Sequence, residues 1–141
     1  MEKPPVPETV PPAVSTLPSS TDGYAQAALM AALEPYRRDD FAGAAMSLEG
    51  FVATHSESAE GWYYLGASRL LSGDPRQARA AFDRAYALNA RVGHPELQWL
   101  AATAEARTGA IESARSKLEA LCATPSPLQV RACAAKESLR R

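Results

Sequence analysis

The chain has 141 residues, of which 46% are hydrophobic and 22% charged, which is enough apolar material for the core of one domain. A net charge of -1 and a pI near 6.1 give no basic surface for nucleic acid or for an anionic membrane. No apolar run approaches the about 18 residues that span a bilayer, so we expect no signal peptide and no membrane insertion by this chain.

Residues 1–22 hold six of the eleven prolines and show neither a helical nor a strand period. A segment of this composition buries too little apolar surface to order itself, so we predict a disordered, Pro-rich linker. Two interpretations stay open: a simple tether, or a ligand for an aromatic-lined groove. We expect the rest of the chain, residues 23–141, to form one helical domain, because alanine is abundant and β-branched residues are few.

Residues 25–58 have the apolar spacing of two consecutive helices. In the first helix, Pro35 removes a backbone donor, so we predict a kink or an early end near Glu34. The second helix is expected to follow Asp40 and to stop by Thr54.

The sequence Gly73-Asp74-Pro75 divides residues 59–92 into two helices, predicted at 59–71 and 75–88. The glycine supplies a left-handed residue that ends one helix, the aspartate caps the next, and the proline occupies its first position. Two helices of this length cannot bury their apolar faces alone, so they require neighbours.

Residues 95–126 predict a third pair, which opens at Pro95 and has its second helix at 111–123. After Ser126-Pro127 we expect a last helix over residues 127–140. Its apolar stripe would cover the end of the stack, and it consists of Leu128, Ala132, Ala135 and Leu139.

These three pairs resemble the tetratricopeptide repeat (TPR), a helix–turn–helix unit of about 34 residues. The motif W-x2-L-G … A-x3-F is matched by Trp62, Leu65, Gly66, Ala78, Phe82 and Ala85. Arg69 and Ala90 depart from the pattern, which prefers Tyr and Pro there. Steps of 34 residues backward and 36 forward bring the flanking pairs into register, giving repeats at about 25–58, 59–92 and 95–126. The resemblance implies an all-α solenoid of three helix hairpins plus a C-terminal capping helix.

Small residues fall where paired helices approach each other in this repeat. We therefore expect Gly66 and Ala78 to face each other at the closest contact of the second hairpin. Trp62 is expected to lie in the core.

The resemblance also implies a concave groove lined by the first helix of each hairpin. The expected lining residues are Leu29, Leu33, Tyr36, Tyr63, Ala67, Leu70, Trp99 and Thr103. This lining is apolar and aromatic, with Glu60 and Glu96 at its rim, so its expected ligand is an apolar or Pro-containing segment of a protein. Residues 4–18 of this chain are expected to compete for the groove by intramolecular docking of the tail.

No arrangement of residues predicts an enzyme, a metal site or a cofactor. His55 and His94 fall in loops between hairpins, and the carboxylates are interpreted as parts of solvated helix faces. Cys122 and Cys133, eleven residues apart, do not have zinc-site spacing. Their placement allows a disulfide but does not require one, so we expect buried free thiols, with a disulfide as the alternative.

A second resemblance, carried by strings such as WYYLGASRLLSGDPRQARAAFDRA, is to the C-terminal domain of bacterial membrane-anchored anti-sigma-factor-like proteins. It implies a non-catalytic scaffold that binds a protein or peptide as the extracytoplasmic sensor part of an envelope protein, placed in the periplasm. The alternatives are a cytoplasmic TPR adaptor that assembles a larger complex and an oligomerisation module.

Overall fold

The structure is a computed structural model that describes the backbone of residues 20–139 and the side chains of residues 25–139. The predicted docking of residues 4–18 and nearly all of the predicted linker lie outside the described residues. The first helix begins at Ser20, inside the segment expected as linker.

Eight helices account for the regular structure of the described residues, which confirms the all-α prediction. They are α1 (Ser20–Ala32), α2 (Glu34–Arg37), α3 (Phe41–Thr54), α4 (Ala59–Leu71), α5 (Pro75–Leu88), α6 (Glu96–Arg107), α7 (Ile111–Ala123) and α8 (Gln129–Ser138). Between residues 20 and 139 no helix combines the length and the apolar character needed to cross a membrane.

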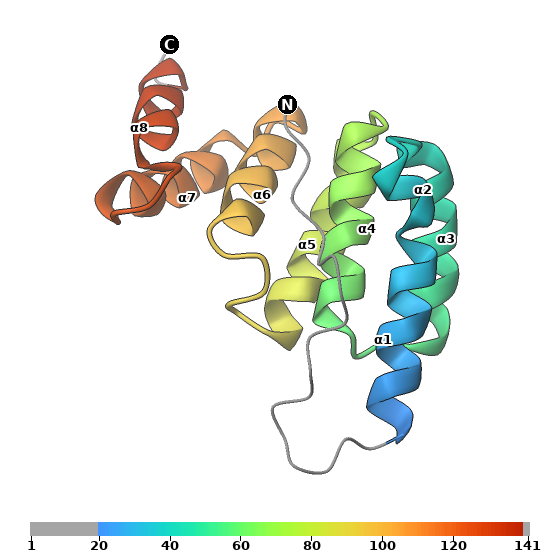
Figure 1. The fold of residues 1–141 in the computed structure, drawn as a ribbon. Coiled ribbons are helices and arrows are strands. Elements are labelled where there is room, and N and C mark those ends of the chain that lie inside the picture. Colours follow the sequence, from blue (N-terminus) through green and yellow to red (C-terminus); the bar gives the residue numbers. More distant parts are fainter. Residues whose placement is uncertain (1–19, 140–141) are drawn as a thin grey trace.

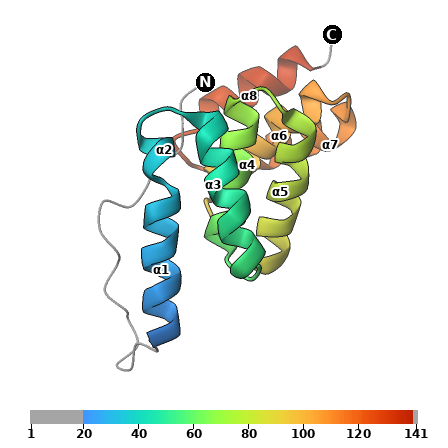
Figure 2. The same ribbon diagram turned by 90° about the vertical axis from the view of Figure 1, so that its right-hand side faces the viewer.

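The helices pack as consecutive hairpins (Figure 1). The pairs are α1/α2 with α3, α4 with α5, and α6 with α7, and α8 packs on α7 at the end of the stack. Figure 2 shows α1 and α5 on opposite sides of the first two hairpins, with α3 and α4 between them. Each hairpin also contacts the next, through α3 with α4 and α5 with α6.

The three hairpin turns share one backbone geometry. Each has a residue in the left-handed region after its first helix: Asp39 (φ 61°), Gly73 (φ 97°) and Gly109 (φ 91°). The next amide then donates to a carbonyl five residues back, in the pairs Asp40–Pro35 (2.9 Å), Asp74–Arg69 (2.7 Å) and Ala110–Glu105 (2.8 Å). This is the Schellman end of a helix, and it reverses the chain at the same point of every hairpin.

The expected break at Pro35 is confirmed, because α1 ends at Ala32 and a separate short helix follows from Glu34. The last helix differs from the prediction at its start. It begins at Gln129, because residues 126–128 form a turn in which the Leu128 amide donates to the Ser126 hydroxyl (3.2 Å).

Side-chain caps begin three of the helices. The side chains of Asp40, Ser58 and Asp74 accept hydrogen bonds from the amides three residues on, at 3.0, 3.1 and 3.2 Å. Ala110, which precedes α7, has φ -82° and ψ 64°, close to the φ -87° and ψ 79° of Asp40, but it carries no acceptor. One amide in the first turn of α7 is therefore without the side-chain partner that α3 and α5 have.

Ala110→Asp is expected to raise the free energy of unfolding by about 1 kcal/mol, since the backbone is already in a capping conformation. Urea unfolding of the variant and of the unsubstituted chain measures the change. Asp74→Ala is the reverse control and should lower stability by about the same amount. An Ala110→Asp midpoint at or below that of the parent chain would contradict this account of the α7 start.

The closest contact of α4 with α5 joins Gly66 to the ring of Phe82. A Cβ added to Gly66 would lie 2.7 Å from two carbons of that ring, so the ring rests on bare backbone. The expected partner, Ala78, is buried in the same core but is not among the three nearest atoms. Trp62 was expected in the core; it is instead half-buried against the core, and its indole N–H donates to the Ser56 carbonyl at 2.9 Å.

Gly66→Ala is expected to lower the free energy of unfolding by about 1–3 kcal/mol, because its methyl group overlaps the Phe82 ring. Gly50→Ala is the matched control, since a Cβ there meets nothing within 4 Å in the middle of α3. That change should raise stability by up to about 1 kcal/mol through helix propensity. Thermal or urea unfolding that ranked the two variants in the opposite order would disprove the assigned contact.

Candidate functional site

The residues expected to line the groove divide into two groups in the structure. Six of the eight expose no more than 7% of their surface and belong to the main hydrophobic core: Leu29, Leu33, Tyr36, Tyr63, Ala67 and Leu70. The other two, Trp99 and Thr103, are half-buried on α6. Trp99 packs against the same core, whereas Thr103 does not belong to it. Peptide binding by all eight stays a prediction, and α6 carries the accessible members.

Aromatic rings fill the space between the first helices of hairpins one and two. The ring centroids of Tyr36 and Tyr64 lie 5.6 Å apart in an edge-on contact, and those of Tyr63 and Tyr64 lie 5.0 Å apart. The chain passes directly over the Tyr63 ring at Gly93, where an added Cβ would lie 2.6 Å from ring carbons. This backbone contact explains why Tyr63 is buried.

The tyrosine hydroxyls of this cluster are strongly favoured in the protonated form. Burial raises the pKa of Tyr36 and of Tyr63 far above the ordinary tyrosine value, and the neighbouring Tyr64 adds to both shifts. Burial, with the nearby carboxylates of Glu60 and Glu96 and against the opposing effect of Arg37, raises the pKa of Tyr64 to about 12. The cluster is therefore neutral, as its position in the core requires.

Stability is expected to fall as the pH rises above about 10, the pKa of an unfolded tyrosine. Above that value the native chain binds more protons than the unfolded chain, so each of these tyrosines contributes a loss of about 1.4 kcal/mol per pH unit. Urea unfolding at pH 8 to 11 measures the slope, which Tyr63→Phe should reduce. Tyr86→Phe, at a half-exposed ring, is the control and should leave the slope unchanged. Equal slopes in all three proteins would refute the assignment.

One side of α6 presents the accessible part of the predicted groove. Glu96, Trp99, Thr103 and Ala106 follow each other at helical spacing, and all four are half-buried. The Thr103 hydroxyl donates to the Trp99 carbonyl at 2.9 Å. Its proton is therefore already used within α6. The side chains form a strip in which one indole and two small residues follow an acidic first turn.

Two carboxylates act electrostatically on the Tyr64 phenol. Glu60 lies in the first turn of α4 and Glu96 in the first turn of α6, and both raise the pKa of Tyr64. Glu96 is also the first residue of the strip on α6. A carboxylate at this end of the strip favours a cationic group on a ligand.

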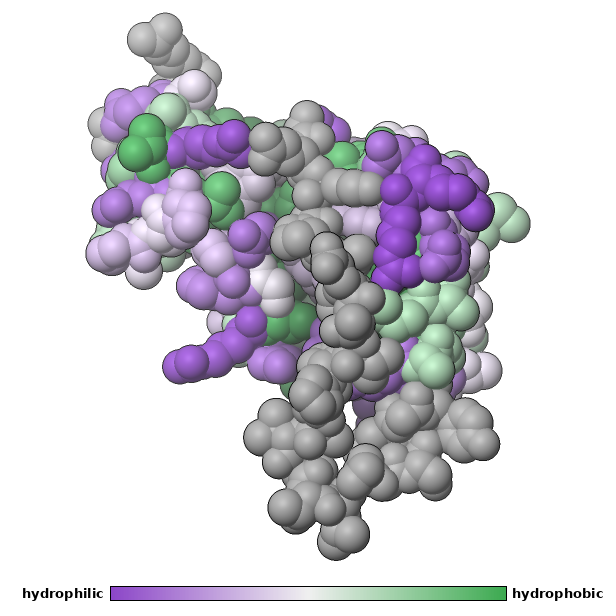
Figure 3. All heavy atoms as spheres, viewed as in Figure 1, coloured by the Kyte–Doolittle hydropathy of each residue, from purple (hydrophilic) through white to green (hydrophobic). Residues whose placement is uncertain are grey.

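The first hairpin is polar at its turn, which follows α2. Figure 3 shows hydrophilic side chains gathered over α2, where Glu34, Arg38 and Asp39 are exposed. Arg37 pairs with Glu34 there, with 2.7 Å between Nη1 and Oε1. The α2 turn therefore presents charges to solvent.

A pocket of about 300 Å³ that the sequence did not predict lies between the second and third hairpins. It contains none of the eight predicted residues, and it is lined by Phe82, Asp83, Tyr86, Leu97, Gln98, Ala101 and Lys117. At its edge, Lys117 Nζ lies 2.6 Å from Oε1 of Glu105. The interpretation of the carboxylates as solvated is wrong for Glu105, which is 2% exposed. The sequence did hold a signal for this burial, because Glu105 stands among apolar residues of α6.

The histidines and cysteines do not form a metal site among residues 20–139, where no group of three or more His, Cys, Asp or Glu side chains lies together. His55 stacks on Phe51, with ring centroids 4.6 Å apart. Cys122 and Cys133 are joined as a disulfide in the structure, so the expectation of buried free thiols is wrong and the alternative holds.

No protein-family model matches the chain, and the comparison with curated protein sequences gives no match. The comparison with solved structures does give matches over nearly the whole chain. The translocator chaperone SycD of type III secretion in Yersinia enterocolitica is 18% identical, with a TM-score of 0.72, covering 91% of this chain and 90% of SycD.

Two further matches contain bound partners. SycD in complex with a peptide of the translocator YopD is 17% identical, with a TM-score of 0.71 and coverage of 89% of this chain and 97% of SycD. PcrH in complex with the chaperone-binding region of PopD is 20% identical, with a TM-score of 0.69 and coverage of 90% and 96%. At these identities the similarity establishes the fold, which confirms the TPR-like helical architecture. None of the proteins named above is an anti-sigma-factor-like protein.

Proposed function

We propose that this chain is a non-catalytic scaffold of the chaperone type, which holds an extended segment of a partner protein against α6. The observation that carries the proposal is the strip on α6, where Trp99 and Thr103 stay accessible while the other predicted groove residues are buried. The fold similarity to chaperones that were solved with translocator segments supports the same class of function.

The partner segment is apolar in its centre and basic at one end. Trp99 and Ala106 offer apolar contact, and the carboxylate of Glu96 lies at the start of the strip. An extended ligand with lysine or arginine near that end would complement both features.

The alternative of an adaptor within a larger complex is favoured over an envelope sensor. This preference rests on structural matches that come from type III secretion: the chaperone SycD, alone and with a YopD peptide, and a complex from Aeromonas hydrophila. An oligomerisation module remains a separate hypothesis, for which the mass in solution is the test.

The test uses two synthetic peptides with the same apolar centre, one flanked by lysines and the other by glutamates. Isothermal titration should show binding of the lysine-flanked peptide, weakened about tenfold or more by Trp99→Ala, since a buried aromatic contact is lost. Glu96→Gln should weaken this peptide about threefold and leave the glutamate-flanked peptide no weaker than before.

Glu119→Gln, an exposed carboxylate on α7, is the charge control, and Trp62→Phe is the aromatic control. If these controls weaken binding as much as the α6 variants, the α6 strip is not the site. The same titration with a chain that lacks residues 1–19 tests tail competition, which predicts a gain of about twofold in affinity.

A further inference from the structure

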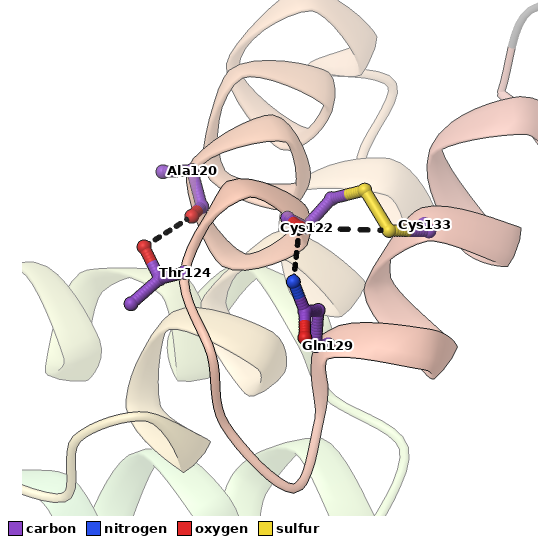
Figure 4. The surroundings of a disulfide bond; sticks show 5 residues. All are labelled: Ala120, Cys122, Thr124, Gln129 and Cys133. Carbon is purple, nitrogen blue, oxygen red and sulfur yellow. Dashed lines mark hydrogen bonds between the residues drawn. A yellow bond between two sulfur atoms is a disulfide. The ribbon is translucent and has the colours of Figure 1, made fainter.

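The link between α7 and α8 combines a disulfide with packing of the two helices on each other. Cys122 lies near the end of α7 and Cys133 in the middle of α8, with their Cα atoms 4.8 Å apart (Figure 4). Both residues are half-buried rather than enclosed. Between them, Gln129 Nε2 donates to the Cys122 carbonyl at 3.0 Å.

Apart from the disulfide, α8 packs on α7 through its apolar face. Ala132 is its one fully buried residue among those described, with Ala135 and Leu139 partly buried beside it. The helix starts at Leu128 without a side-chain cap, and Arg115 Nη2 donates to the Leu139 carbonyl at 2.9 Å. Closing a loop of about a dozen residues with a disulfide favours the docked helix on the order of 100-fold. The covalent link therefore adds to the packing that docks α8 on α7.

The surface that α8 covers adjoins the candidate binding strip. Ala132 completes a small core with Ala114, Leu118 and Leu121 of α7 and Ala102 of α6. Trp99 and Ala106 of the strip pack against this same core. When α8 leaves, Leu118 and Leu121 lose their cover, and apolar surface continues from α7 to the strip.

We propose that the Cys122–Cys133 disulfide is a redox switch that controls this extension of the binding surface. The regulatory part rests on the proposed peptide-binding function, whereas the release of α8 does not. A dithiol reductant attacks one sulfur as a thiolate and forms a mixed disulfide, which frees the other cysteine as a thiolate. The second thiol of the reductant then displaces the remaining cysteine. The chain gains two electrons and two protons as two thiols, and the reductant becomes a disulfide.

The arrangement suits a switch because the oxidised and the reduced chain would differ only around α8. The main core extends from α1 to α6, and the small core that α8 completes is a different cluster of buried residues. Release of α8 therefore leaves the first two hairpins intact, as expected for a helical array in which each unit contacts only its neighbours. Reducing compartments keep such cysteines as thiols, and oxidising compartments pair them.

Hydrogen exchange followed by mass spectrometry, on the full chain with and without a phosphine reductant, tests the switch. Reduction should speed exchange in residues 128–139 by about tenfold or more and leave α4 and α5 unchanged. The double variant Cys122→Ser/Cys133→Ser should exchange fast in both conditions. Unchanged exchange of α8 in the reduced parent chain overturns the switch.

Titration of the lysine-flanked peptide in both redox states tests the regulation. The reduced chain should bind about tenfold more tightly, because two additional leucines become available for contact. The double variant should show this higher affinity with or without reductant. If α8 opens and the affinity stays constant, the regulatory role is overturned and the proposed function stands. If no peptide binds in either state, the proposed function fails with the regulation, and exchange alone decides whether α8 is released.

Discussion

The contact of the Phe82 ring with the backbone of Gly66 fixes the distance between α4 and α5, and much of the remaining structure is built around this pair. Phe82 also packs near Tyr63, with ring centroids 6.4 Å apart, and forms one wall of the pocket between the second and third hairpins. The same device recurs where Tyr63 meets Gly93. A ring placed on a glycine brings two helices close without a void, which dense interior packing requires.

The candidate binding strip lies on α6, where the main hydrophobic core ends and a second core begins. The main core extends from α1 to the Ala104 position of α6, and a second core begins at Ala102 of the same helix. Trp99 packs against both cores and is only half-buried. The helix α6 thus joins two separately packed parts of the molecule, and the accessible apolar side chains of the predicted groove lie on it.

Local signals in the sequence predicted the helices well, and tertiary contacts account for the differences. Gly73-Asp74-Pro75 gave the bounds of α4 and α5, since caps and turn residues act within a few positions. The repeat register placed Tyr36 and Tyr63 on the groove side but could not show their burial, which depends on neighbours such as Gly93. Glu105 was missed for the same reason, because its partner Lys117 lies on another helix.

The contact surfaces between neighbouring hairpins, here called seams, also determine the order in which the hairpins can be arranged. At the first seam the large residue is Phe51 of α3, and it packs on Gly61 of α4. The equivalent positions at the second seam are Ala85 and Leu97, so the bulk has moved to the later helix. A second copy of residues 59–92 would set Ala85 against Gly61 and leave a void, and its removal would set Phe51 against Leu97. Gain or loss of a unit by duplication or deletion in the gene would therefore require compensating changes at a seam.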